Sequence, residues 1–144
     1  MSSQTVAALQ AVLAAENAAC YGYGVVGSHL TGTGLATTAD SDWVAHQRAR
    51  DSLTAMITAA GADPVPASVA YQLPAAVSTA GEARALAVAL EDGVAQAYIG
   101  LVGLTDLTLR ALGARGLQSA ALRAAAWRRG TVAFPGLPAG SLRS

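Results

Sequence analysis

Two glutamates stand out because each interrupts an apolar segment whose residues recur with helical spacing. Glu16 lies in the stretch AAENAACYGYGVVG, and Glu91 lies in AVALEDGVAQAYIGLVGL. A carboxylate buried in such a segment must bind a metal or pair with a cation, because an isolated buried charge is too costly. The candidate partners are His46, Arg50 and Arg123, and helix geometry places the two arginines at heights similar to those of the glutamates. The sequence therefore predicts a buried polar layer of Glu16, Arg50, Glu91 and Arg123 and leaves its chemistry open.

The first chemistry is metal binding. Diiron carboxylate bundles join a Glu from each of two helices to a Glu-x-x-His motif from each of the other two. The position three before His46 is Trp43, and Asp106 is the only acid of the last helical segment. A dinuclear set cannot be assembled. Glu16, His46 and Glu91 could hold one iron or manganese ion, although neighbouring arginines would oppose it electrostatically.

The second chemistry is ion pairing. Arg50 and Arg123 would neutralise Glu16 and Glu91 through bidentate hydrogen bonds, with no catalytic residue and no cofactor. Removing one partner of a buried pair strands a charge, so Glu16→Gln and Arg50→Met should each destabilise strongly but less than additively together.

Other side chains of these segments admit a third chemistry. Tyr21, Tyr23 and Tyr98 are typical of core tyrosines hydrogen-bonded to a carboxylate or carbonyl. With Gly24 they could instead line an apolar pocket for a small ligand. Trp43 and Trp127 are interpreted as core anchors, and Cys20 as a small core hydrophobe.

The elements that position these residues are four helices, since no segment shows the alternation of a strand. Capping signals mark their starts and glycines their ends. The predicted helices cover residues 5–29, 40–61 (from Asp40 or Ser41), 79–104 (after Ser78 or Thr79, with Glu82 completing a capping box) and 105–129 (before Gly130). Gly113 and Gly116 lower the helix propensity in the middle of the last helix, which favours a kink.

The connections predict the topology. Residues 30–39 form a short hairpin, so the first two helices should be antiparallel. Residues 62–77 are proline-rich and, at about 3.3 Å per residue, long enough to cross a bundle roughly 30 Å tall. The fold class is therefore all-α, a four-helix bundle with one long crossover between the second and third helices, covering residues 1–130. Residues 131–144 form a non-helical tail in which Phe134 and Leu137 are candidates for docking on the bundle.

Composition excludes several functions. The chain contains no lysine, which removes Schiff-base chemistry, a pyridoxal phosphate anchor and a Gly-Lys-Ser/Thr phosphate loop. Nine acids balance nine arginines, so no basic surface for nucleic acid is expected. The acids within the apolar segments argue against membrane spans. MSSQTVAALQ lacks the positive region of a secretory signal, and a cytoplasmic protein is expected.

Six short motifs occur in the order AAENAACYGYGVVG, AHQRARDSL, AYQLP, LEDGVAQAYIGLVG, LRAAAWRRG and FPGLP. Together they resemble the ferritin-like domain family of unknown function found in high-GC bacteria. The resemblance implies a ferritin-like four-helix bundle without an assigned activity. Glu16 and Glu91 match the glutamates of the first and third ferritin helices, and His46 matches only the histidine of the second-helix motif. Arg123 and Trp127 stand where the fourth-helix ligands would be, which argues against ferroxidase, oxygenase and iron-storage functions.

The resulting hypothesis is a noncatalytic ferritin-like bundle with a metal-free, ion-paired centre that acts through protein contacts, as a homodimer or with another protein. The alternatives are a metal-binding protein or oxidoreductase with an atypical carboxylate and histidine site, and a small-ligand carrier. Metal content separates the first alternative from the others.

Overall fold

Four helices and their connections make up the computed structural model, which describes residues 1–129 and Pro135. The helices are α1 (Ser3–Ser28), α2 (Ala36–Ala59), α3 (Ala80–Val102) and α4 (Leu107–Arg128), and the described residues contain no strand. The predicted all-α class with four helices is confirmed. The expected docking of Phe134 and Leu137 lies outside the described residues.

Side chains at the helix starts explain most of the boundaries. The predicted capping box is present: the Glu82 amide donates to Thr79 Oγ1 at 3.1 Å, and the Thr79 amide donates to Glu82 Oε2 at 3.1 Å. Helix α4 begins at Leu107, two residues after the predicted start, because Asp106 caps it by accepting from the Leu109 amide at 2.9 Å. The capping box of α3 is a local motif, which is why the sequence predicts it correctly.

The start of α2 corrects the sequence prediction. The helix begins at Ala36, so Asp40 lies inside its first turns rather than at its N-cap. Leu35 occupies the cap position and makes no side-chain cap hydrogen bond. Thr33 Oγ1 instead accepts from the Leu35 amide at 3.2 Å, which turns the chain into the helix before Asp40 is reached.

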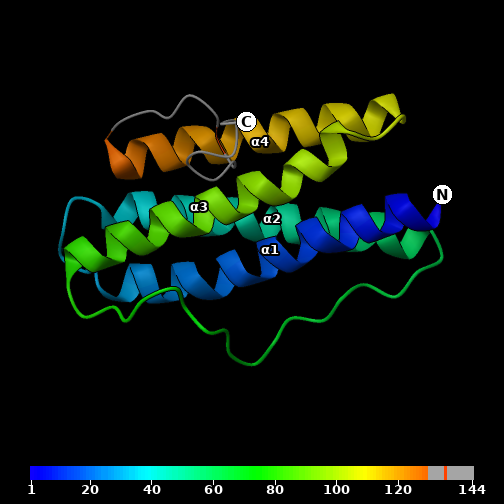
Figure 1. Cartoon of the computed structure of the whole chain (residues 1–144). Coiled ribbons are helices and arrows are strands. Elements are labelled where there is room, and N and C mark those ends of the chain that lie inside the picture. Colours follow the sequence, from blue (N-terminus) through cyan, green and yellow to red (C-terminus); the bar gives the residue numbers. More distant parts are fainter. Residues whose placement is uncertain (130–134, 136–144) are drawn as a thin grey trace.

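The topology follows the two kinds of connection (Figure 1). Helices α1 and α2 are antiparallel neighbours, and residues 60–79 then run back along α1, so that α3 lies parallel to α2. Gln10 fastens this crossover to α1: its amide nitrogen donates to Asp63 O and its amide oxygen accepts from the Val65 amide, both at 2.7 Å. The predicted crossover is present. Helix α1 packs against α2 and α3, and α3 also packs against α4, which together form a four-helix bundle.

The core is divided into two apolar clusters. One includes Leu9, Leu13, Leu53 and Leu101, and the other includes Tyr23, Val26, Leu86 and Trp127. On α2 and α3, the buried residues His46 and Glu91 lie between the residues of the two clusters, and on α1 the buried Glu16 lies between Leu13 and Ala19 of the first cluster. A polar layer therefore crosses the middle of the bundle.

The glycines of α4 allow a close approach to α3. A Cβ atom at Gly113 would lie 2.7 Å from Leu101 Cβ and 2.8 Å from the Val102 backbone nitrogen, and one at Gly116 would overlap the Tyr98 ring. Residues 107–128 form one uninterrupted α-helix. Close packing of α4 on α3 accounts for these two residues.

Among the described helices, only α3 is long and apolar enough to cross a membrane, by length and composition alone. However, 39% of its most apolar window is buried inside the bundle, and Glu91 lies near its middle. A core helix meets the same criteria, so this match is weak evidence for a span.

Candidate functional site: a buried carboxylate and histidine centre

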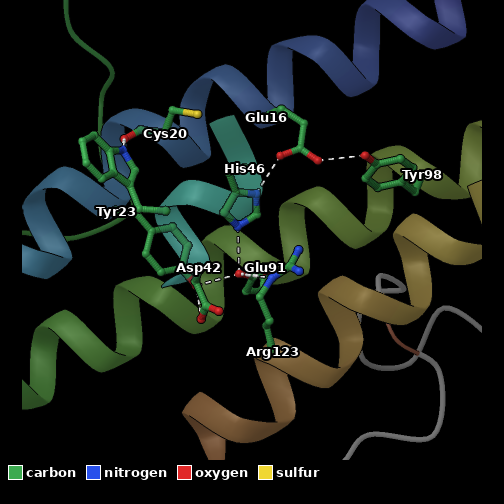
Figure 2. A network of polar contacts seen from close by, with 9 residues as sticks. Glu16, Cys20, Tyr23, Asp42, His46, Glu91, Tyr98 and Arg123 are labelled. Atoms are coloured by element: carbon green, nitrogen blue, oxygen red, sulfur yellow. Dashed lines mark hydrogen bonds and ion pairs between the residues drawn. The ribbon is translucent and has the colours of Figure 1, made fainter. Parts of the chain in front are cut away.

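His46 lies at the centre of the polar layer and joins three helices (Figure 2). Its Nδ1 lies 2.6 Å from Glu16 Oε2, and its Nε2 lies 2.9 Å from Glu91 Oε1. All three side chains are buried. Because both ring nitrogens face carboxylate oxygens, both must carry a proton to make these hydrogen bonds. The geometry therefore describes an imidazolium between two glutamates.

The electrostatics agree with this protonation state. Burial lowers the pKa of His46, but hydrogen bonds to Glu16 and Glu91 and their charges outweigh burial and raise it to about 9. Burial raises the pKa of Glu91, but the His46 hydrogen bond and charge, together with Arg123, hold it below its usual value. Each group thus stabilises the ionised form of its neighbour.

Glu91 accepts three hydrogen bonds on a single oxygen. Oε1 receives the Tyr23 hydroxyl at 2.6 Å and Arg123 Nε at 2.9 Å, in addition to His46. Its Oε2 is the one buried side-chain oxygen or nitrogen of the described residues without a hydrogen-bond partner. Arg123 brings α4 into the centre, where two cations now balance two carboxylates.

Two tyrosines close the layer on either side. The Tyr98 hydroxyl donates to Glu16 Oε1 at 2.9 Å, and the Tyr23 ring lies 5.1 Å from the His46 ring. Burial, followed by the charge of the adjacent glutamate, raises the pKa of both tyrosines well above the usual value. Neither is poised to ionise near neutral pH, and both act as hydrogen-bond donors.

Asp42 extends the network beyond the residues that the sequence singled out. It accepts from Trp127 Nε1 at 2.8 Å and lies within 3.4 Å of the Tyr23 hydroxyl. Burial raises its pKa. Its position four residues before His46 places it on the same helix face, and this spacing is the signal that could have identified it.

The structure corrects the expected place of Arg50. Its guanidinium pairs with the adjacent Asp51, Nη2 to Oδ1 at 2.8 Å, and its side chain is 35% exposed. His46, one turn earlier, takes the place beside the glutamates. Arg50 lies at the partly exposed side of α2. There Asp51 and solvent can accept hydrogen bonds from its guanidinium without the cost of burying a charge.

The predicted pocket residues separate into different environments. Tyr98 belongs to the buried centre, and Tyr21 packs against Tyr71 with ring centroids 5.5 Å apart. Tyr23 and Gly24 do line one groove together, but it includes neither of the other two tyrosines. Trp127 is buried as expected, whereas Trp43 is 36% exposed and is not a core anchor.

The donor set does not fit a divalent cation. A histidine that binds a metal must offer an unprotonated nitrogen, and both nitrogens of His46 face carboxylates. The Arg123 guanidinium lies against Glu91, where a metal would need an unopposed carboxylate. Within the described part of the chain, no three His, Cys, Asp or Glu side chains form a group that could hold an ion.

The fold and centre define a class of small four-helix proteins with a buried, ion-paired histidine and glutamate layer. The family profile described as "Domain of unknown function (DUF4439)" matches residues 8–139, and the chain belongs to this family. It is similar to a solved structure, a conserved hypothetical protein, Rv2844, from Mycobacterium tuberculosis. The two are 33% identical, the match covers 90% of this chain and 98% of that one, and the TM-score is 0.84. The comparison with curated proteins finds no match.

Proposed function

We propose that this protein is a noncatalytic, cytoplasmic ferritin-like bundle whose metal centre is replaced by an ion-paired core, and that it acts through protein contacts. The single long crossover supports the ferritin-like assignment, because it is the connectivity of ferritin-like folds. The chain's resemblance to a ferritin-like family in its ordered sequence motifs supports it further.

The main support for the proposal is that both ring nitrogens of His46 contact glutamate side chains. Its Nδ1 and Nε2 lie 2.6 and 2.9 Å from two different glutamates, and the neighbouring cation is Arg123. Such a layer holds α1, α2, α3 and α4 in register, but it exposes no nucleophile, base or vacant ligand position. A fully connected buried network of this kind holds the helices together, whereas breaking one of its pairs leaves an uncompensated buried charge.

Metal content tests the proposal. Untagged protein is incubated anaerobically with ferrous iron, manganese and zinc, desalted, and measured by mass spectrometry. We expect less than about 0.1 metal per chain, since binding would require His46 to lose a proton and Arg123 to move away. His29→Ala serves as the matched control, because His29 lies near the end of α1, away from the centre. Stoichiometric metal that His29→Ala retains and Glu91→Gln loses would overturn the proposal.

One observation favours the alternative of an atypical metal-binding or oxidoreductase site. Glu91 Oε2 is buried and has no hydrogen-bond partner, and buried polar atoms are rarely left unsatisfied. Iron or manganese on Glu16, His46 and Glu91 would satisfy it only after rearrangement of the centre. The same metal measurement decides between the two, and oxygen consumption by a metal-loaded sample would then be the next test.

For the protein contact we propose a homodimer formed through α4. A groove of about 420 Å³ is formed by α3, α4 and Pro135 and is lined mainly by apolar atoms, including Val102, Leu117 and Leu122. Leu122 is 64% exposed, and with the other apolar residues of the groove it forms a contiguous apolar surface of the kind that marks protein contacts. Analytical ultracentrifugation should show a dimer for the wild type and a monomer for Leu122→Glu. Ala55→Glu, which adds the same charge on the exposed side of α2, should remain dimeric. A monomeric wild type would turn the search to a different protein partner.

A further inference from the structure

A groove that shares only Tyr23 with the buried centre lies between the second half of α1 and the first half of α2. Its volume is about 360 Å³, and its lining includes Gly24, Gly27, Ala39, Asp40 and Trp43. This volume falls at the lower end of the range for small-molecule sites. Neither the ion-paired layer nor the proposed dimer contact accounts for it.

Trp43 forms an aromatic wall that is both exposed and fixed. The side chain is 36% exposed, yet its indole nitrogen donates to the Cys20 carbonyl at 3.0 Å. This hydrogen bond ties Trp43 of α2 to the backbone of α1 and restrains the orientation of the ring. An exposed tryptophan ring held in this way offers its face to a cation.

Asp40 supplies the charge. Its side chain is exposed at the groove, and it makes no ion pair with the described residues. No arginine or histidine is among the groove residues. Asp42, two residues later, is a second acid, and it accepts a hydrogen bond from Trp127 instead of lining the groove. The charge in the groove is therefore negative and complements a cation.

The two glycines of α1 supply the space. A Cβ atom at Gly24 or Gly27 would meet nothing within 4 Å, whereas one at Gly22 would lie 2.5 Å from Leu90. Helix packing thus explains Gly22 but not the other two. Glycine within a helix is unfavourable relative to alanine, and here its effect is to leave the groove open beside Trp43.

From this aromatic wall, unpaired carboxylate and open glycine floor, we infer that the groove binds a small organic ammonium ion, with the cation between the Trp43 face and Asp40. Recognition of an ammonium group by an aromatic face and a carboxylate needs no buried charge on the protein. The inference is independent of the metal status of the centre and of the oligomeric state.

Choline is the probe, and 3,3-dimethylbutan-1-ol is its matched control, because it has the same shape without the charge. Isothermal titration calorimetry and amide NMR shifts of the full chain measure binding. We expect choline to saturate the groove with a Kd on the order of 1 mM and the neutral alcohol to bind at least about tenfold more weakly. The shifted resonances should include the Trp43 indole N–H and the amides of residues 24–27.

Surface variants provide the structural controls. Asp40→Asn and Gly24→Leu should each weaken choline binding at least about fivefold, one by removing the charge and the other by filling the groove. Asp63→Asn, an exposed acid on the crossover, and Gly100→Leu, an exposed glycine of α3 with the same open surroundings, should bind as the wild type does. The inference is overturned if choline does not saturate, if the alcohol binds equally well, or if Asp40→Asn binds like Asp63→Asn.

Discussion

At the residue scale, the second ring proton of His46, which lets the imidazolium donate to both glutamates, gives the bundle a pH-dependent stability. Folding raises the pKa of His46 from 6.5 to about 9, so the folded protein holds this proton more tightly than the unfolded chain does. The resulting stabilisation is fully present below about pH 6.5 and is lost as the pH rises toward 9. At about 1.4 kcal/mol per pH unit, the loss should be about 3 kcal/mol.

Urea denaturation between pH 6 and pH 9.5 measures this loss as a fall in the free energy of unfolding. His29→Gln should show the same fall, because only His46 joins the centre. A flat profile across this range would mean that His46 is neutral in the folded protein. At the acid end the sign reverses: the pKa of Glu91 is lowered on folding, so its contribution is lost as the pH falls below about 4.5.

The ion pairs of the centre should couple Glu91 to Arg123. Glu91→Gln removes the partner of two buried or half-buried cations and should cost about 3 to 5 kcal/mol. Arg123→Met should also destabilise, and the double variant should fall short of the sum by about 1 kcal/mol or more. Arg50→Met serves as the contrast. Loss of its exposed pair with Asp51 should cost about 0.5 kcal/mol, and this cost should be additive with that of Glu16→Gln. Denaturant melts of each single and double variant measure these free energies, and an additive Glu91 and Arg123 pair would contradict the structure.

The comparison of Arg50 with His46 shows what residue spacing can predict at such a site. Counting 1.5 Å per residue placed Glu16, Glu91 and Arg123 at one height, and the structure brings these three side chains into one layer. Spacing does not say which of two polar residues one turn apart points inward. That choice depends on the alternatives each has: Arg50 can pair with Asp51 in water, whereas His46 satisfies both glutamates at once. Asp42 lies one turn before His46 on α2, and its partners, Tyr23 and Trp127, come from α1 and α4.

At the element scale, glycine has opposite roles on α3 and α4. A Cβ atom at Gly113 would press on the backbone of α3, whereas one at Gly100 would meet nothing within 4 Å. Gly113→Ala should therefore destabilise by about 1 to 3 kcal/mol through overpacking. Gly100→Ala should stabilise by up to about 1 kcal/mol, because alanine is the better helix former. Thermal unfolding should show Tm shifts of opposite sign, and two shifts of the same sign would refute this account of the α3 and α4 contact.

The same glycines mark the limit of element prediction from sequence. The helices themselves follow from periodicity and caps such as Thr79 with Glu82, which are local features. Whether Gly113 bends its helix or admits a neighbour depends on Leu101 and Val102, which belong to another helix. The early start of α2 has a similar origin, since the turn at Thr33 competes with the N-cap signal of Asp40.

At the scale of the whole molecule, the centre joins all four helices. A variant in which the whole ion network is replaced by apolar side chains tests whether the network has a role beyond holding the helices together. Replacing a complete buried ion network with apolar residues of similar volume is often neutral or stabilising by about 1 to 4 kcal/mol. The variant must also remove the two tyrosine hydroxyls, because they would lose their hydrogen-bond acceptors when the glutamates are replaced. It therefore combines Glu16→Met, His46→Leu, Glu91→Met and Arg123→Met with Tyr23→Phe and Tyr98→Phe.

We expect this apolar variant to remain helical, to keep the oligomeric state of the wild type, and to lose the fall in stability between pH 6.5 and 9. Circular dichroism, ultracentrifugation and urea melts measure the three properties. The control is the single variant Glu91→Gln, which should be much less stable than the apolar variant because it leaves His46 and Arg123 with too few partners. If the apolar variant instead binds hydrophobic dyes and loses fixed side-chain signals, the centre specifies the packing of the bundle and cannot be replaced by apolar volume alone.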